Sequence, residues 1–475
     1  MKYKNKVISG IIWSAVEKIG QQVFQIVIAI ILARLLQPSD YGMIGLMSTF
    51  IIVSRVFVDS GFNEALIRKQ NCKSIDYTSI FWFNLLLSIV IYVFLFCIAP
   101  YISVFFSMPY EFIKLSRVLF LAIPINAFNL VQTTVLNKKL DFKKIAKYTI
   151  FSSLLSGICG ISLAYCGGGA WALIVQNLLF SILYTIFLWS KSTWFPSFNF
   201  SFNVIKEVWS FSRNMLMTGI LNTAFNNAYT FIIARIYSSH QLGLYSQANR
   251  YGSIPAILFE NVLSRVTYPV LSEYQSNNLA LQKYFKDFFS FILYLLLPLM
   301  LFLIVSSEEL VLCVLSEKWI MLVPYFKIVC LMGITFPFQT LCVAAMKVKG
   351  NSSLILKLEI VKKTLIAISI LLTYKNGIMF MLYGQLVFYI LALLLNLFYV
   401  CRILKDSFVL FVKDAIYTSI PALIAFVFTV LLGSLISGNI FMLFLVKALI
   451  FFLIYLTVIL SFYKKKVLYI KTLFK

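Results

Sequence analysis

Apolar runs of about 20 residues recur along the whole length of this chain and limit its possible folds more than any other feature. A run of that length, wound as an α-helix, crosses a hydrocarbon core of about 30 Å. Of the 475 residues, 61% are hydrophobic and 12% are charged, whereas soluble domains have about 45–50% apolar and about 25% charged residues. No gap between the runs is long enough for a soluble domain. The bilayer is therefore the expected solvent, and the sequence predicts an all-α, polytopic membrane protein.

The spacing of the apolar runs predicts 14 membrane helices. The stretch after the basic N-terminus contains Glu17 and Lys18 and no small-residue cleavage site, so it is interpreted as the first helix and not as a signal peptide. The longest connection, 191–207, falls between the sixth and seventh helices. We therefore expect two pseudo-symmetric six-helix lobes, 1–195 and 196–405, followed by two additional helices and a basic tail in 406–475. The predicted helices are 8–36, 41–64, 78–106, 112–137, 143–166, 169–190, 208–236, 242–268, 284–306, 320–346, 353–374, 378–401, 413–436 and 440–463.

The net charge of +24 is distributed unevenly between alternate connections. One set of connections is rich in lysine and arginine, for example at 138–147 and 464–475. The other set has almost no lysine or arginine, for example at 37–39 and 437–439. Lysine and arginine are retained on the cytoplasmic side of a membrane. This pattern predicts that both termini are cytoplasmic, and it explains the positive charge by topology, so no nucleic-acid partner is expected.

A short signature occurs twice, at 33–42 and 234–243. Each copy has an Ala-Arg pair that ends an apolar helix, then a polar turn, then a glycine that opens the next helix. An apolar chain that repeats its own layout is typical of a transporter built from two halves with the substrate between them.

Polar stripes mark the first two helices of each predicted half, whereas the other helices are apolar on every side. A charged group near the bilayer centre costs at least ~2.5–3.5 kcal/mol, so it must face a partner or water. We therefore expect these four helices to face one wet cavity with a net positive charge, which suits a phosphate or a diphosphate. The candidate anion-binding residues are Lys18, Arg55, Arg250 and Arg265, and the candidate polar lining residues are Gln21, Gln25, Asp59, Asn222, Asn226, Glu260 and Asn261.

Other interpretations of these residues remain open. Asparagine, glutamine and serine stripes also hold membrane helices together without any ligand. Arg55 and Asp59 lie one turn apart and are able to form a structural ion pair. Arg265 is also compatible with an arginine that snorkels to the cytoplasmic interface.

Catalytic, metal and cofactor motifs are missing from the sequence. The eight cysteines are scattered without metal-ligand or redox spacing, and His240 is the single histidine. No glycine-rich loop precedes a Lys-Ser or Lys-Thr pair. All connections are short, whereas a glycosyltransferase or a sugar polymerase usually needs a sizeable extramembrane loop. We therefore expect neither an enzyme nor a bound cofactor or metal.

Several short segments, in their order and spacing, resemble the Wzx-type polysaccharide flippases, which carry O-antigen or colanic acid units and belong to the multidrug/oligosaccharidyl-lipid/polysaccharide exporter superfamily. The segments are Ala33 to Leu36 with Pro38, Tyr41 and Gly42; Phe57, Asp59, Gly61, Ala65 and Leu66; Leu136 to Lys139 with Asp141 and Phe142; Gly169 to Leu173; and Leu242 to Ala248, followed by Ile254, Pro255 and Pro269.

The resemblance implies a V-shaped bundle of two six-helix lobes, with helices one, two, seven and eight around a central cavity. It also implies a substrate, an oligosaccharide on undecaprenyl diphosphate that is turned from the inner to the outer leaflet of the bacterial inner membrane. Related lipid II flippases place cationic side chains around the diphosphate, which suggests that role for Lys18, Arg55 and Arg250. Family members often have an acidic residue before the second signature, where this chain has Asn226 and Asn227.

The resulting hypothesis is an exporter that works by alternating access within membrane lipids and is driven by an H⁺ or Na⁺ gradient or by the membrane potential. A polysaccharide polymerase and glycosyltransferases are candidate protein partners. The alternatives are a multidrug cation antiporter of the same superfamily, which requires an acidic pocket, a lipid II flippase with the same fold, and a scaffold for glycan assembly enzymes that transports nothing.

Overall fold

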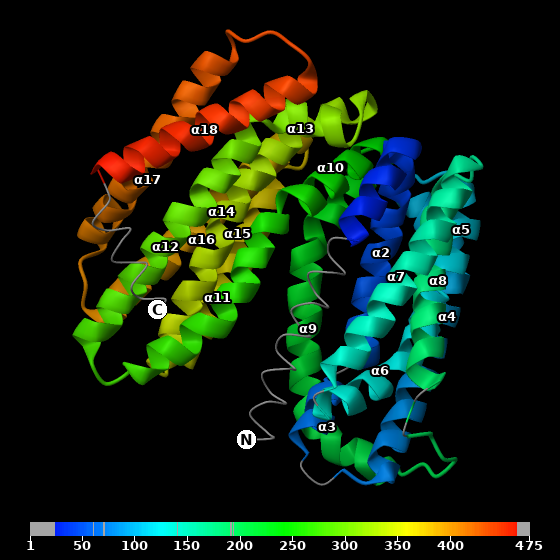
Figure 1. Ribbon diagram of the computed structural model, residues 1–475. Coiled ribbons are helices and arrows are strands. Elements are labelled where there is room, and N and C mark those ends of the chain that lie inside the picture. The colour runs from blue at the N-terminus through cyan, green and yellow to red at the C-terminus, as the bar shows by residue number, and fades with distance from the viewer. Residues whose placement is uncertain are drawn as a thin grey trace. The chain divides into compact units, whose positions relative to one another are not determined.

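A computed structural model describes residues 24–59, 61–69, 72–139, 141–190, 192 and 194–462, and every regular element in these ranges is a helix (Figure 1). The chain divides between Gly243 and Leu244 into two units, each with its own set of packed helices. The predicted all-α class is therefore confirmed.

The first unit contains the helix Phe24–Leu35 and eight further helices that precede α10. Helix α7 packs along α8, α4 along α6, and α2 along α9. Two segments predicted as single helices are interrupted. The first break lies at Gly61, whose φ of +74° is a left-handed conformation that favours glycine; the second separates α5 from α6. The helices are α2 (Pro38–Asp59), α3 (Phe62–Arg68), α4 (Ser74–Phe105), α5 (Glu111–Leu119), α6 (Ala122–Lys138), α7 (Phe142–Tyr165), α8 (Ala170–Ser190) and α9 (Phe202–Ile236).

The second unit is built around α14, which packs against α11, α12 and α16, while α18 covers α17 and the short helix α13. The segment predicted as one helix at 242–268 is divided at Ser253, because Pro255 lies in the first turn of α11 and lacks the N–H that a continuous helix needs. The helices are α10 (Ser239–Gly252), which begins in the first unit, α11 (Ile254–Glu273), α12 (Asn278–Val305), α13 (Ser307–Val314), the 3₁₀-helix η1 (Glu317–Leu322), α14 (Val323–Val348), α15 (Ser352–Thr373), α16 (Ile378–Leu404), α17 (Phe408–Gly433) and α18 (Ile440–Phe462).

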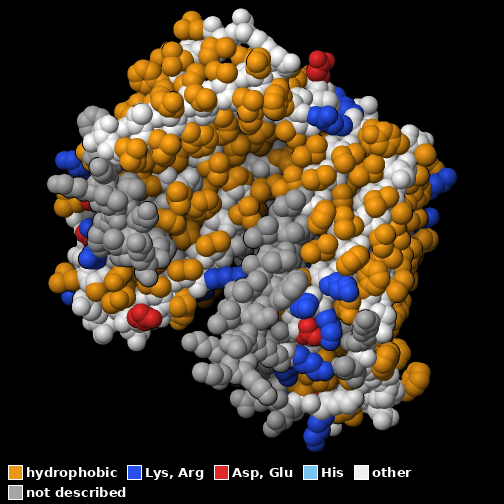
Figure 2. All heavy atoms as spheres, in the orientation of Figure 1, with side chains coloured by type: hydrophobic (Ala, Val, Ile, Leu, Met, Phe, Trp, Pro, Cys, Tyr) orange, Lys and Arg blue, Asp and Glu red, His pale blue; other side chains and the backbone are white. Residues whose placement is uncertain are grey.

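Ten helical segments within the described ranges are long and apolar enough to cross a membrane, so the protein is a multi-pass membrane protein. Helices α9, α11 and α15 have sufficient length but are not among the ten. Two of them, α9 and α11, carry the polar stripes noted in the sequence. Hydrophobic side chains cover most of the visible helix surface in Figure 2, as expected for helices whose outer faces contact lipid.

The long connection before α9 is attached to the first unit by side chains of two membrane helices. The indole Nε1 of Trp82 on α4 donates to the carbonyl oxygen of Ser197 at 2.9 Å. The amide Nε2 of Gln132 on α6 donates to the carbonyl oxygen of Trp194 at 2.9 Å. These contacts hold the connection that leads into α9 against α4 and α6, in agreement with the place of α9 in the first unit. The predicted division of the chain into two six-helix lobes at 195/196 stays a prediction.

The two copies of the repeated signature meet where the first turn of α2 crosses the first turn of α10. A Cβ atom added to Gly42 would overlap the carbonyl oxygen of Ser239, and one added to Gly243 would overlap the carbonyl oxygen of Pro38. The contact is reciprocal, because each glycine lies against the backbone of the other signature. The signature glycines are therefore required for close approach of two backbones, as small residues are at helix crossings in membranes.

Replacing either signature glycine with alanine should separate the two helices and destabilise the first unit. We expect Gly42→Ala and Gly243→Ala each to cost about 1–3 kcal/mol, the usual range for overpacking, and to lower the melting temperature of the detergent-purified protein by several degrees. Gly438→Ala is the matched control, because a Cβ there meets no atom within 4 Å. Unchanged melting of both signature variants would contradict the assigned role of the crossing.

Candidate functional site

A cavity of about 620 Å³ lies inside the first unit, between α2, α3, α6, α8 and the end of α5. Its volume falls in the range of about 300–1,000 Å³ that is typical of small-molecule sites. Two of the predicted site residues, Arg55 and Asp59, are on its wall. The lining residues are Ser48, Ile51, Ile52, Arg55, Val58, Asp59, Asn63, Ile67, Leu119, Ala122, Ile123, Asn126, Ala127, Asn129, Leu130, Thr133, Thr134, Asn137, Asn177, Phe180, Ser181 and Tyr184.

Arg55 supplies the positive charge of this cavity wall. Its side chain is exposed, and the described part of the chain contains no ion pair between Arg55 and Asp59. The structural ion pair that the sequence left open is therefore not formed by these two residues. A guanidinium group carries five N–H donors in a planar fork that matches phosphate oxygens. The position of Arg55 is thus suited to an anionic group at the cavity.

Asparagine side chains are the most frequent polar groups in the cavity wall, and sequence reasoning missed them. Asn129 on α6 is 6% exposed, and neither Oδ1 nor Nδ2 of its amide has a hydrogen-bond partner among the described residues. Asn63 accepts a hydrogen bond from the hydroxyl of Thr134, and Nδ2 of Asn177 donates to the carbonyl oxygen of Leu173 at 2.8 Å. Asn126 and Asn137 complete the set.

The missed residues had a sequence signal. Asn126, Asn129, Thr133 and Asn137 follow one another at steps of three or four residues, which places them on one face of α6. The helix around them was judged apolar on every side because its remaining residues are mostly hydrophobic. A search for polar stripes in every helix, including the most apolar ones, would have found this face.

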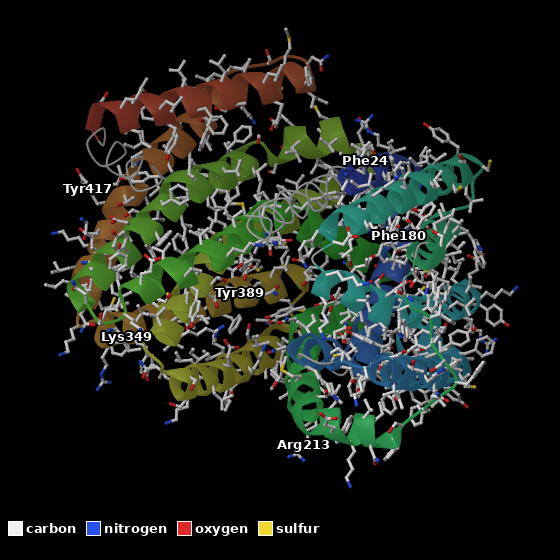
Figure 3. All side chains as sticks on the ribbon, turned by 60° about the horizontal axis from the view of Figure 1, so that its bottom comes forward. Phe24, Phe180, Arg213, Lys349, Tyr389 and Tyr417 are labelled. Carbon is white, nitrogen blue, oxygen red and sulfur yellow. The ribbon has the colours of Figure 1, made fainter. Side chains whose placement is uncertain are left out.

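An aromatic pair on α8 forms another part of the cavity wall. The rings of Phe180 and Tyr184 are stacked, with centroids 5.9 Å apart and an interplanar angle of 3°. Both residues line the cavity, and Figure 3 shows Phe180 on α8. The cavity wall thus combines two aromatic side chains with several hydrogen-bonding side chains.

A cluster of charged side chains lies just beyond one end of the cavity. Lys69, two residues after the lining residue Ile67, contacts Asp76 Oδ1 at 3.2 Å and Glu207 Oε2 at 3.0 Å through its Nζ. Lys138 Nζ donates to the carbonyl oxygen of Lys69 at 2.7 Å. Burial opposes the charge of Lys69, but hydrogen bonds and Coulombic attraction from the two carboxylates outweigh it and raise the pKa of Lys69. The cluster therefore ties α3, α4 and α9 together.

The remaining predicted residues of the N-terminal half are placed as follows. Lys18 and Gln21 lie outside the described residues. Gln25 is half-buried on the helix Phe24–Leu35. Asn222 and Asn226 are exposed on α9 and do not line the cavity.

The predicted residues of the second unit lie on α10 and α11. Arg250, near the end of α10, is exposed, as are Asn261 and Arg265 on α11. Glu260 is half-buried and accepts a hydrogen bond at 2.8 Å from the hydroxyl of Thr340 on α14. Convergence of these residues with Arg55 on one shared cavity stays a prediction.

A family described as "Polysaccharide biosynthesis protein" matches residues 31–324. The chain belongs to this family. It is 23% identical over 332 residues to the teichuronic acid biosynthesis protein TuaB of Bacillus subtilis, a match that covers 69% of this chain and 68% of that protein. It is 24% identical over 336 residues to the lipopolysaccharide biosynthesis protein WzxC of Escherichia coli, covering 70% of this chain and 68% of that protein. The resemblance inferred from the sequence is confirmed.

Among solved structures, the lipid II flippase MurJ in an inward closed conformation matches with a TM-score of 0.75. The match covers 96% of this chain and 100% of that chain at 17% identity, so it concerns the fold alone. The protein is therefore a multi-pass membrane protein of the polysaccharide biosynthesis family, with the fold of that flippase. The prediction that it is not an enzyme is confirmed by this family membership.

The charge cluster beside the cavity predicts unequal effects of two substitutions. Lys69→Met should destabilise the protein by about 1–2 kcal/mol, because the side chain of Asp76 is only 5% exposed and would lose its cation. Glu207→Gln should cost less than about 1 kcal/mol, since the side chain of Glu207 is 63% exposed. Thermal unfolding of the two purified variants measures the difference, and equal losses would contradict this assignment.

Proposed function

We propose that this protein moves an oligosaccharide linked to undecaprenyl diphosphate from the inner to the outer leaflet of the bacterial cytoplasmic membrane by alternating access. One observation carries the proposal. The family match at 31–324 includes all the helices that line the Arg55 cavity, together with α10 and α11. The relatives named above act in the biosynthesis of teichuronic acid and lipopolysaccharide, which are both built from sugar units.

In this proposal arginines hold the diphosphate of the carrier. Arg55 on α2, Arg250 on α10 and Arg265 on α11 are exposed side chains, and each can bind phosphate oxygens through two parallel N–H donors. A diphosphate entering the hydrocarbon region without such partners would carry a large desolvation cost. The polyprenyl tail has no such cost and remains among the lipids.

The charge pattern of the connections supports loading from the cytoplasm. Lysine and arginine side chains gather toward the lower end of the first unit in Figure 2. In sequence, Lys69 lies two residues after the cavity residue Ile67, and Lys138 directly follows the cavity residue Asn137. By the positive-inside rule this end faces the cytoplasm, as do both termini. A gradient of H⁺ or Na⁺, or the membrane potential, would bias the two access states.

The composition of the cavity favours this substrate over an organic cation. A multidrug cation antiporter requires an acidic, drug-sized pocket, whereas the cavity of the first unit contains Arg55, Asp59 and several asparagines. The fold match to MurJ leaves lipid II as a second candidate cargo. Complementation of a strain depleted of its lipid II flippase distinguishes the two cargoes, because an oligosaccharide exporter is expected not to restore growth.

Neutralising the proposed diphosphate ligands should abolish export without loss of protein. We expect Arg55→Gln and Arg250→Gln each to reduce surface polysaccharide by about tenfold or more, because each removes a charge-assisted bidentate contact of about 1.5–3 kcal/mol. Immunoblotting of membranes and quantification of surface polysaccharide are the measurements. Arg402→Gln, which removes an exposed arginine near the end of α16, should leave export unchanged. Full export by both test variants would rule out these arginines as ligands.

A further inference from the structure

We infer that the cavity of the first unit binds the sugar portion of the lipid-linked substrate through the asparagines of α3, α6 and α8. The inference rests on the proposed function and adds a second recognition element to it. Arg55 would serve the diphosphate, and the asparagine-lined wall would serve the hydroxyl groups of the glycan.

The first argument is the chemistry of the wall. Each asparagine side chain offers one carbonyl acceptor and two N–H donors, and sugar hydroxyls both donate and accept. Asn63, Asn126, Asn129, Asn137 and Asn177 all line the cavity, together with the hydroxyls of threonines 133 and 134. Sites for drug-like molecules are mostly apolar with few polar groups. A wall with this many neutral hydrogen-bonding side chains therefore fits a carbohydrate better than a lipophilic compound.

The second argument is the condition of Asn129. Its side chain is 94% buried, since only 6% is exposed, and it lines the cavity. Within the described ranges, neither polar atom of its amide has a partner. A buried amide without a partner destabilises a folded protein, and at Asn129 this unpaired amide lies on a cavity wall that a ligand can reach. A ligand hydroxyl in the cavity would satisfy both Oδ1 and Nδ2.

The third argument is the aromatic surface. The parallel rings of Phe180 and Tyr184 both line the cavity, and a pyranose ring has a face of C–H bonds that packs on an aromatic side chain. Asparagines for the hydroxyl groups and an aromatic pair for the C–H face together match the two chemical faces of a sugar. The aromatic pair would not contribute to the binding of an inorganic anion.

The test uses the full-length protein in lipid nanodiscs and two probes, undecaprenyl diphosphate and the same lipid carrying an oligosaccharide repeat unit. Asn129→Leu should weaken binding of the glycosylated probe by about tenfold and leave binding of the bare lipid within about twofold. Asn126→Ala should act in the same direction, and because Asn126 is exposed this variant keeps the test valid if Asn129→Leu folds poorly. Arg55→Gln should weaken both probes.

Asn84→Leu is the matched control for Asn129→Leu. Asn84 on α4 is fully buried and its amide also has no partner within the described residues, but it does not line the cavity. Both leucine variants remove a buried, unpaired amide, so neither should lower the melting temperature of the unliganded protein. Of these two leucine variants, only Asn129→Leu should weaken binding of the glycosylated probe.

Unchanged affinity of both Asn129→Leu and Asn126→Ala for the glycosylated probe would overturn the sugar site. Translocation of that probe by wild-type protein in proteoliposomes tests the proposed function separately. If wild type fails to translocate it, the flippase proposal is overturned, and the oligosaccharide released from its lipid becomes the probe for the cavity. Loss of its binding in Asn129→Leu would then still support the sugar site, and equal binding by wild type and variant would overturn it.

Discussion

The lack of water in a hydrocarbon core is the constraint on which this structure depends. Backbone groups there must be paired within helices, and polar side chains must face one another or a cavity. Asn129 would be unfavourable on a lipid-facing surface, and it is located instead on the inner wall of the first unit beside Asn63 and Thr134. The same constraint gathers five asparagines of the first unit on one cavity wall, and so it distinguishes this wall from the apolar outer faces.

Much of the fold was predictable because a membrane helix has a simple sequence requirement, a long apolar run. Interruptions within such runs were not predictable by the same reasoning. Gly61 and Pro255 lie at breaks, whereas Pro100 and Pro298 lie inside the continuous helices α4 and α12. Whether a proline ends a membrane helix depends on neighbouring groups that replace the lost hydrogen bond, and a single sequence does not contain that information.

The candidate site was predicted in part. Arg55 and Asp59 were found because charged residues in an apolar helix are conspicuous, and both line the cavity. The asparagines of α6 were missed because an amide contributes little to a charge pattern and is also common as contact between helices. The repeated signature was recognised, but its physical role was not evident, because overlap between Gly42 and the backbone of Ser239 is a property of packing in three dimensions.

The attachment of the connection before α9 to α4 and α6 has a consequence for how the chain can be taken apart. Trp82 and Gln132 hold this connection through Ser197 and Trp194, and the division between the units falls after Gly243, inside α10. The boundary between the units thus falls within a helix, and the connection before α9 lies wholly inside the first unit. If the gene were cut in that connection and the two fragments were co-expressed, α9 would be on the fragment that carries the second unit. A split that keeps α9 with the first unit follows the helix boundary near Tyr237 and Ser238.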